Sequence, residues 1–90
     1  METYMITVKK FSGTWCAPCK VLAPIMQEVK HDISGVHFMD IDVDDSPEIT
    51  AKYGVRSVPT VVIEKDGTEV ARFAGVQSKL TYVNAITAVQ

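Results

Sequence analysis

The sequence predicts a single α/β domain that spans residues 1–90, and three patterns support this class. An amphipathic helical pattern over residues 16–33 separates two runs rich in β-forming residues, 4–11 and 36–43, which together describe a right-handed βαβ unit with parallel strands. The pair Asp66-Gly67 is a strong hairpin signal and predicts two further, antiparallel strands. A hydrophobic content of 47% in 90 residues suffices for one small core, and neither a linker nor a repeat divides the chain.

Composition excludes several classes of function. A net charge of −2 gives no basic footprint for nucleic acid. No apolar run approaches the ~18 residues of a membrane span, and the N-terminus lacks the basic and apolar regions of a signal peptide. Two cysteines are too few for a disulfide-rich secreted scaffold. We therefore expect a cytoplasmic monomer, in which a C-x-x-C pair is more often catalytic or metal-binding than structural.

The first half of the chain begins with the strand at residues 4–11, which leads through Ser12-Gly13-Thr14 into the helix. Pro24 interrupts the helical pattern and predicts a kink, or alternatively a helix that begins only at Pro24. Ser34-Gly35 ends the helix, and residues 36–43 form the second strand. The helical positions that we expect to face the core are Leu22, Ile25, Met26, Val29 and Ile33.

The second half predicts a short helix with an Asp or Ser N-cap, Pro47 in its first turn and Gly54 at its end. Strands at residues 61–64 and 68–73 flank the hairpin turn. Ser78 caps a final helix whose core-facing residues are predicted to be Leu80, Val83, Ile86 and Val89. A group of acidic residues after the second strand lacks the spacing of a calcium loop, so strand-end and capping roles are favoured for Asp40, Asp42, Asp44 and Asp45.

The two cysteines, Cys16 and Cys19, occur where the first strand gives way to the helix. A helix that begins at Cys16 places this sulfur near free backbone N–H groups at the positive end of the helix dipole, which favours a thiolate. Cys19 lies on the same helical face and within reach of a disulfide. Pro18 is tolerated in a first helical turn, where its missing N–H costs no hydrogen bond. The spacing therefore indicates a reversible dithiol with one activated sulfur.

Two other interpretations of the cysteine pair stay open. The spacing C-x2-C-x11-H-x5-H, which includes His31 and His37, is close to that of a zinc site. Against zinc, a helical pattern starts at the first cysteine, and His37 falls in a predicted strand, so the two histidines would not share a helical turn. A purely structural disulfide is the second alternative.

Five features occur in order along nearly the whole chain: Trp15-Cys16-Ala17-Pro18-Cys19-Lys20, Pro24, Val58-Pro59-Thr60, Asp66-Gly67 and Gly75. In order and spacing they resemble the corresponding motifs of the thioredoxin family. The resemblance implies a four-stranded mixed sheet of order 2-1-3-4, with strand 3 antiparallel to the others and helices on both faces. Compared with a full-length thioredoxin, the chain lacks an N-terminal strand and helix, and its size is closer to that of a glutaredoxin.

The resemblance also implies a role for each matching residue. Cys16 matches the exposed nucleophile that attacks a substrate disulfide, and Cys19 matches the resolving cysteine. Pro59 matches a cis-proline packed against the dithiol, a conformation that is energetically accessible to an X–Pro bond. The substrate-binding surface that it implies consists of Trp15, Ala17, Pro18, Val58, Pro59 and Gly75.

Two departures from the family pattern stand out. Ala17 replaces a glycine that is usual between the cysteines, and the residues at this place tune the redox potential. Lys10 stands where thioredoxins usually have a buried aspartate, and Asp40 where they usually have a lysine. Strand parity allows the two to meet, so we expect Lys10 and Asp40 to form a partly buried pair beneath the dithiol that tunes thiolate stability or proton transfer. Alternatively, Lys10 reaches solvent and has no chemical role.

The function implied is that of a thiol–disulfide oxidoreductase that reduces protein disulfides, without metal or bound cofactor, as a general or ribonucleotide-reductase-directed electron donor. Its electron source would be a thioredoxin reductase using NADPH and flavin, or glutathione. Lys9 and Arg56 could contact the carboxylates of glutathione, although surface charge is the simpler interpretation. The alternatives are glutaredoxin-like or isomerase-type exchange, a zinc module through Cys16, Cys19, His31 and His37, and an adaptor without catalysis.

Overall fold

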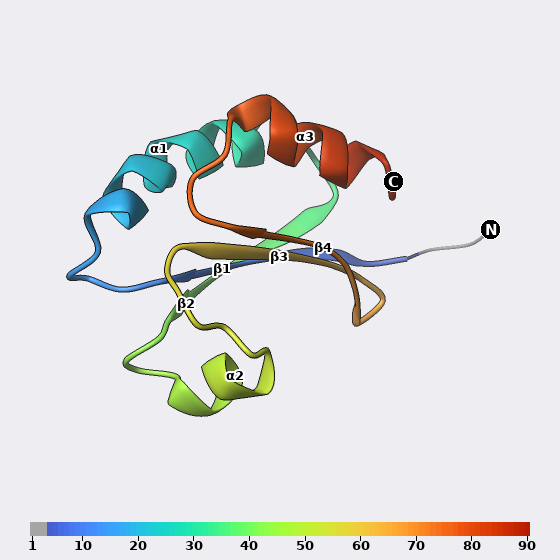
Figure 1. Cartoon of the computed structure of the whole chain (residues 1–90). Helices are drawn as coiled ribbons and strands as arrows, with labels where there is room; N and C mark the ends of the chain where they lie inside the picture. Colours follow the sequence, from blue (N-terminus) through green and yellow to red (C-terminus); the bar gives the residue numbers. More distant parts are fainter. Residues whose placement is uncertain (1–3) are drawn as a thin grey trace.

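The computed structural model describes residues 4–90. In chain order its elements are β1 (Ile6–Ser12), α1 (Ala17–Asp32), β2 (Val36–Asp42), α2 (Pro47–Lys52), β3 (Thr60–Lys65), β4 (Thr68–Ala74) and α3 (Lys79–Thr87). The four strands form one sheet in the order β2-β1-β3-β4, with β1 and β2 parallel and the other two pairs antiparallel. Helices α1 and α3 cover one face and α2 lies on the other (Figure 1). The predicted fold class and sheet order are confirmed.

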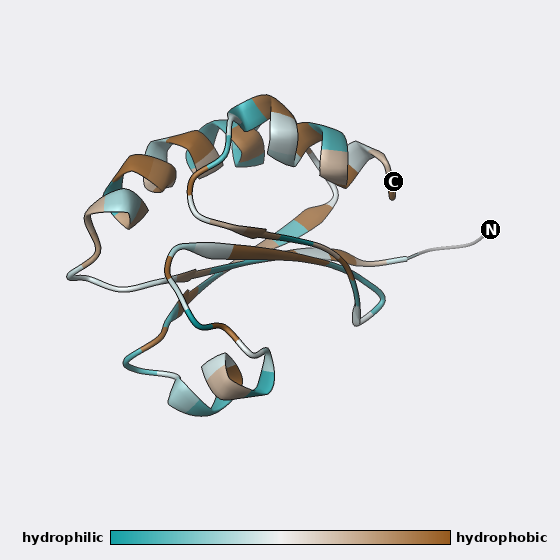
Figure 2. Ribbon diagram, viewed as in Figure 1, coloured by the Kyte–Doolittle hydropathy of each residue, from teal (hydrophilic) through white to brown (hydrophobic). Residues whose placement is uncertain are grey.

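The main core lies between the sheet and the α1/α3 layer. Alternate residues of the two central strands point into it, and both helices close it from above. Hydrophobic residues are concentrated along the middle of the sheet, most clearly on β3 (Figure 2). The buried members are Ile6, Val8, Leu22, Met26, Val29, Val61, Ile63, Tyr82 and Ile86.

A smaller core lies on the opposite face, beside α2. Phe11, Ile41 and Val62 form its buried part, and residues that flank α2 pack against them. All six residues of α2 are at least partly exposed, so this short helix touches the sheet through its flanks rather than through a buried stripe. Among residues 4–90, no helix is long and apolar enough to cross a membrane.

Local signals placed the turns correctly. In the β3–β4 hairpin, Asp66 and Gly67 have φ values of 53° and 83°, the two positive angles that a type I′ turn requires. Helix α1 begins at Ala17 and includes Pro24, so the alternative of a helix that starts at Pro24 is wrong. The strand ends differ from prediction by one or two residues, as expected where pairing rather than composition decides the boundary.

The predicted core face of the last helix is wrong at one position. Leu80 is 65% exposed, whereas Tyr82 and Ile86 are fully buried. Residues 82 and 86 are four apart and lie one above the other, while residue 80 lies about 200° around the helix from residue 82. The buried stripe therefore starts at Tyr82, and Leu80 points away from the sheet.

Candidate active site

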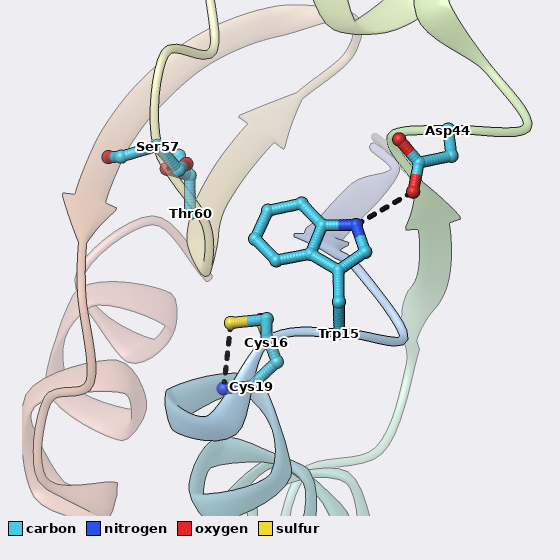
Figure 3. Close-up of a disulfide and its surroundings, with 6 residues drawn as sticks. All are labelled: Trp15, Cys16, Cys19, Asp44, Ser57 and Thr60. Atoms are coloured by element: carbon cyan, nitrogen blue, oxygen red, sulfur yellow. Dashed lines mark hydrogen bonds between the residues drawn. A yellow bond between two sulfur atoms is a disulfide. The ribbon is translucent and has the colours of Figure 1, made fainter.

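Cys16 and Cys19 form a disulfide at the N-terminus of α1, with their Cα atoms 5.3 Å apart. Cys16 is the N-cap of the helix, one residue before its first helical residue. Its Sγ accepts a hydrogen bond from the backbone N–H of Cys19 at 3.2 Å (Figure 3). Pro18 occupies the first turn, as its missing N–H allows. The cap therefore directs backbone donors at the first sulfur.

Both cysteines are largely buried, with exposed fractions of 4% for Cys16 and 7% for Cys19. The expectation of an exposed Cys16 is wrong for this disulfide form. Its sulfur is bonded to Cys19 and lies against the first helical turn, while the loop that carries Ser57 lies opposite (Figure 3). Ala17 and Pro18, in contrast, are exposed beside the disulfide.

Trp15 is 65% exposed, and its indole is nevertheless held in place. The ring Nε1–H donates a hydrogen bond to Oδ2 of Asp44 at 2.7 Å (Figure 3). Asp44 itself lies in the loop after β2, where Asp42 accepts hydrogen bonds from the backbone N–H groups of Asp44 and Asp45. The predicted strand-end role is thus confirmed for Asp42. The hydrogen bond between Asp44 and Trp15 was not predicted from the sequence.

The Val58–Pro59 peptide bond is cis, and Pro59 is fully buried. The carbonyl oxygen of Pro59 accepts a hydrogen bond from the N–H of Gly75 at 2.8 Å, so two residues sixteen apart in sequence meet. Gly75 has a φ of 80°, which favours glycine. Within the described residues, a Cβ added at Gly75 would meet no atom within 4 Å. Glycine is therefore favoured at this position by its backbone conformation and not by close packing.

Lys10 and Asp40 are paired, with 3.3 Å between Nζ and Oδ1. They are direct neighbours across the parallel β1–β2 pair. The Lys10 side chain is 14% exposed and that of Asp40 78%, so the lysine is partly buried and the aspartate faces solvent. Lys10 also lines a hollow of about 360 Å³ whose wall includes Cys19. The predicted partly buried pair of Lys10 and Asp40 is therefore present.

The four residues of the zinc interpretation do not converge. His31 lies near the C-terminal end of α1, fifteen residues from Cys16, which corresponds to roughly 22 Å along a helix axis. His37 is exposed on β2. In residues 4–90 no group of three or more His, Cys, Asp or Glu side chains could hold a metal ion.

A second buried polar cluster, on the α2 face, was missed by sequence reasoning. Lys9 Nζ lies 3.1 Å from Glu64 Oε1 and donates to the hydroxyl of Tyr53, which in turn donates to Glu64 Oε2. Burial alone would lower the pKa of Lys9, but its hydrogen bonds to Tyr53 and Glu64 together raise it. Lys9 is thus not the free surface charge that was expected, because Glu64 is its carboxylate partner.

Comparison with known proteins agrees with this geometry. The model of the thioredoxin family matches residues 2–88. The chain belongs to the thioredoxin family. A thioredoxin of Staphylococcus aureus is 43% identical over 70 residues, which cover 77% of this chain and 67% of that protein. The structure of Fasciola hepatica thioredoxin has a TM-score of 0.88 at 37% identity and covers 96% of this chain and 82% of its own.

A mutant thioredoxin of Halobacterium salinarum gives a TM-score of 0.85 at 30% identity, over 92% of this chain and 73% of its own. Family membership and the Cys16–Cys19 pair identify the protein as a thiol–disulfide oxidoreductase. Thioredoxins act on disulfide substrates, so the disulfide at the start of α1 is the redox centre.

Proposed function

We propose that the protein reduces disulfides of other proteins, with Cys16 as the attacking and Cys19 as the resolving cysteine. The observation that carries this order is the N-cap position of Cys16, whose sulfur accepts the Cys19 N–H at 3.2 Å. In the reduced protein the same donor and the helix dipole stabilise a thiolate at Cys16. Cys19 lies inside the first turn, where that stabilisation is weaker.

The reaction transfers two electrons in two exchange steps. The Cys16 thiolate attacks one sulfur of the substrate disulfide, forms a mixed disulfide and releases the other substrate sulfur as a thiolate. Cys19 then loses its proton and attacks Cys16 Sγ, which releases the second substrate thiolate and forms the Cys16–Cys19 disulfide. The substrate is reduced and the protein is oxidised, and both released thiolates take up protons from solvent.

The substrate-binding surface that we propose surrounds the disulfide. Exposed Trp15, Ala17 and Pro18 lie on one side of it, at and just before the start of α1. On the other side the half-buried Val58 offers its backbone, Pro59 fixes the loop, and Gly75 adjoins Pro59. We propose that the peptide segment around the target disulfide binds across these two sides.

Lys10 is proposed to favour the thiolate of Cys19, because its partly buried side chain lines the same hollow as this residue. Two other charged residues, Lys20 and Asp42, line the same hollow. Asp40 partly neutralises Lys10 from the solvent side. Lys10→Met should therefore slow the resolving step, by about three- to tenfold for a charge in an open hollow, and Asp40→Asn should accelerate it. Equal effects of Lys10→Met with and without Asp40→Asn would show that the two side chains act independently, and would contradict the pairing.

Re-reduction is proposed to come from a flavin-dependent thioredoxin reductase that uses NADPH, with glutathione as the second candidate. The protein would act in the cytoplasm as a monomer, on several disulfide proteins or on ribonucleotide reductase. Equilibration against glutathione buffers separates the two sources. A potential near about −270 mV supports the reductase and one near about −200 mV supports glutaredoxin-like exchange.

Cysteine variants test the order of attack directly. Cys19→Ser should accumulate a mixed disulfide with an oxidised protein substrate, because nothing resolves it, and Cys16→Ser should accumulate none. The adduct is measured by non-reducing electrophoresis and mass spectrometry. Accumulation with Cys16→Ser but not with Cys19→Ser would reverse the assignment.

A further inference from the structure

Helix α2 connects the two loops that face the dithiol. The loop before it contains Asp44, which holds the indole of Trp15. The loop after it contains Ser57 and the cis Val58–Pro59 bond, across from Cys16 (Figure 3). The position of α2 on the sheet therefore affects both sides of the proposed substrate-binding surface at once.

The helix itself offers little to fix that position. All six of its residues are at least partly exposed, and it lies at one end of the lower sheet face (Figure 1). A helix of this length has too few hydrogen-bonded turns to be stable alone. Contacts from its flanks must therefore determine where it lies.

Val43 and Val55 on its flanks pack on the smaller core, and Tyr53, the C-cap of α2, adds contacts with three strands. Its ring packs on Phe11 of β1 with 5.6 Å between centroids. Its hydroxyl accepts from Lys9 of β1 and donates to Glu64 of β3, both at 2.5 Å. Its carbonyl oxygen accepts from Nη2 of Arg72 of β4 at 2.6 Å.

The hydroxyl contacts are buried enough to be specific. The side chains of Glu64 and Lys9 are 7% and 17% exposed, so water competes little for the tyrosine hydroxyl that bridges them. The Lys9 ammonium also lies 4.6 Å from the Tyr53 ring centroid, which adds a cation–π contact. These groups select one position for the end of α2.

We propose that Tyr53 is a positioning residue for protein substrates, because it fixes α2 and, through it, the loops of Asp44 and Pro59. It touches neither cysteine and leaves the thiol chemistry unchanged. The inference rests on the proposed reduction of protein disulfides, and it predicts a loss in substrate binding rather than in exchange chemistry.

Tyr53→Phe is the sharpest test, since it keeps the ring on Phe11 and removes only the hydroxyl. The variant loses the hydrogen bonds of the hydroxyl to Lys9 and Glu64 and keeps the direct Lys9–Glu64 ion pair. We expect the KM for a disulfide-bonded protein substrate to rise about three- to tenfold. The kcat and the rate with a small aromatic disulfide should stay unchanged. Fluorescence of Trp15, the single tryptophan of the chain, should report a changed environment.

Ile86→Val is the matched control, because Ile86 is fully buried in the main core, on the sheet face opposite α2. It should lower thermal stability while KM and Trp15 fluorescence stay as in the wild type. If Tyr53→Phe behaves like Ile86→Val, Tyr53 has only a structural role and the proposal is wrong. Inactivity of the wild-type protein toward protein disulfides would refute the proposed function instead, and the fluorescence comparison would still decide the role of Tyr53.

Discussion

Gly13 lies directly beneath the indole of Trp15, and Gly13→Ala should displace this ring. A Cβ at position 13 would lie 2.8 Å from Cε2, 2.9 Å from Nε1 and 3.0 Å from Cζ2 of Trp15. Non-bonded carbon atoms prefer separations of about 3.5–4.0 Å, so the ring must move by roughly 0.5–1 Å. Because Trp15 is mostly exposed, the ring is free to move outward rather than force the backbone apart.

The same movement weakens the hydrogen bond from Nε1 to Asp44, now 2.7 Å long, because Nε1 is among the atoms closest to the new methyl group. Loss of such a bond costs about 0.5–1.5 kcal/mol. Replacement of glycine by alanine returns about 0.4–1 kcal/mol by restricting the unfolded chain. The free energy of unfolding should therefore change by less than about 1 kcal/mol, while the surroundings of the indole change clearly.

The assay combines thermal unfolding with tryptophan emission and quenching by a neutral quencher. Asp44→Asn is the matched variant, since it weakens the same hydrogen bond without a clash. We expect similar spectral changes in both variants, little further change when they are combined, and a higher KM for protein disulfides in each. Wild-type emission and KM in Gly13→Ala would refute the close contact between Gly13 and the indole.

Three further predictions follow from contacts away from the disulfide. Lys9→Met leaves the Glu64 carboxylate buried with one partner fewer and should destabilise the protein by about 2–3 kcal/mol in urea unfolding. The pKa of Lys9 is raised on folding, so the stability that Lys9 contributes is complete below the pKa of an unfolded lysine. This stability is lost as the pH rises through the pKa of Lys9 in the folded protein. The Lys9→Met variant should therefore lose less stability in alkali than the wild type. Tyr82→Phe removes the hydroxyl that accepts from the Gln77 N–H at 3.0 Å, and calorimetry should show a loss of about 1 kcal/mol, whereas an unchanged melting temperature would mean that water replaces it. Leu80→Glu, at a position 65% exposed, should change the free energy of unfolding by less than about 0.5 kcal/mol. A larger loss would show that Leu80 packs in the core.

The elements of this fold were predictable because their signals are local. Three examples depend only on residues a few positions apart in the sequence: the Asp66-Gly67 turn, the Ser78 cap and the alternation within β1. The chemistry of the cysteine pair was predictable for the same reason, since the spacing of the cysteines and the start of the helix are both set by neighbouring residues in one short segment.

Contacts between distant segments carried no such signal. Trp15 and Asp44 are 29 residues apart, and the side chains of Lys9 and Glu64 come from different strands. In the sequence alone, each of these charged residues looks like an ordinary exposed surface residue. Its partner lies beside it only in the folded sheet. The error at Leu80 has another origin, since two overlapping helical stripes were available and packing against the sheet selected the one through Tyr82.

The adjacent lysines of β1 show how strand register and site geometry are linked. Lys9 points to the α2 face, where Glu64 lies, and Lys10 points to the α1 face, where Asp40 lies. A slip of one residue in β1 would exchange these faces, remove both lysines from their carboxylates and turn Phe11 out of its core. The register that satisfies both charges also pairs Phe11 with Thr60. That pairing places the end of β1, which leads to Cys16, beside the start of β3, which follows Pro59. The Lys9–Glu64 pair, which joins β1 to β3, therefore helps to hold the disulfide and the cis-proline loop together.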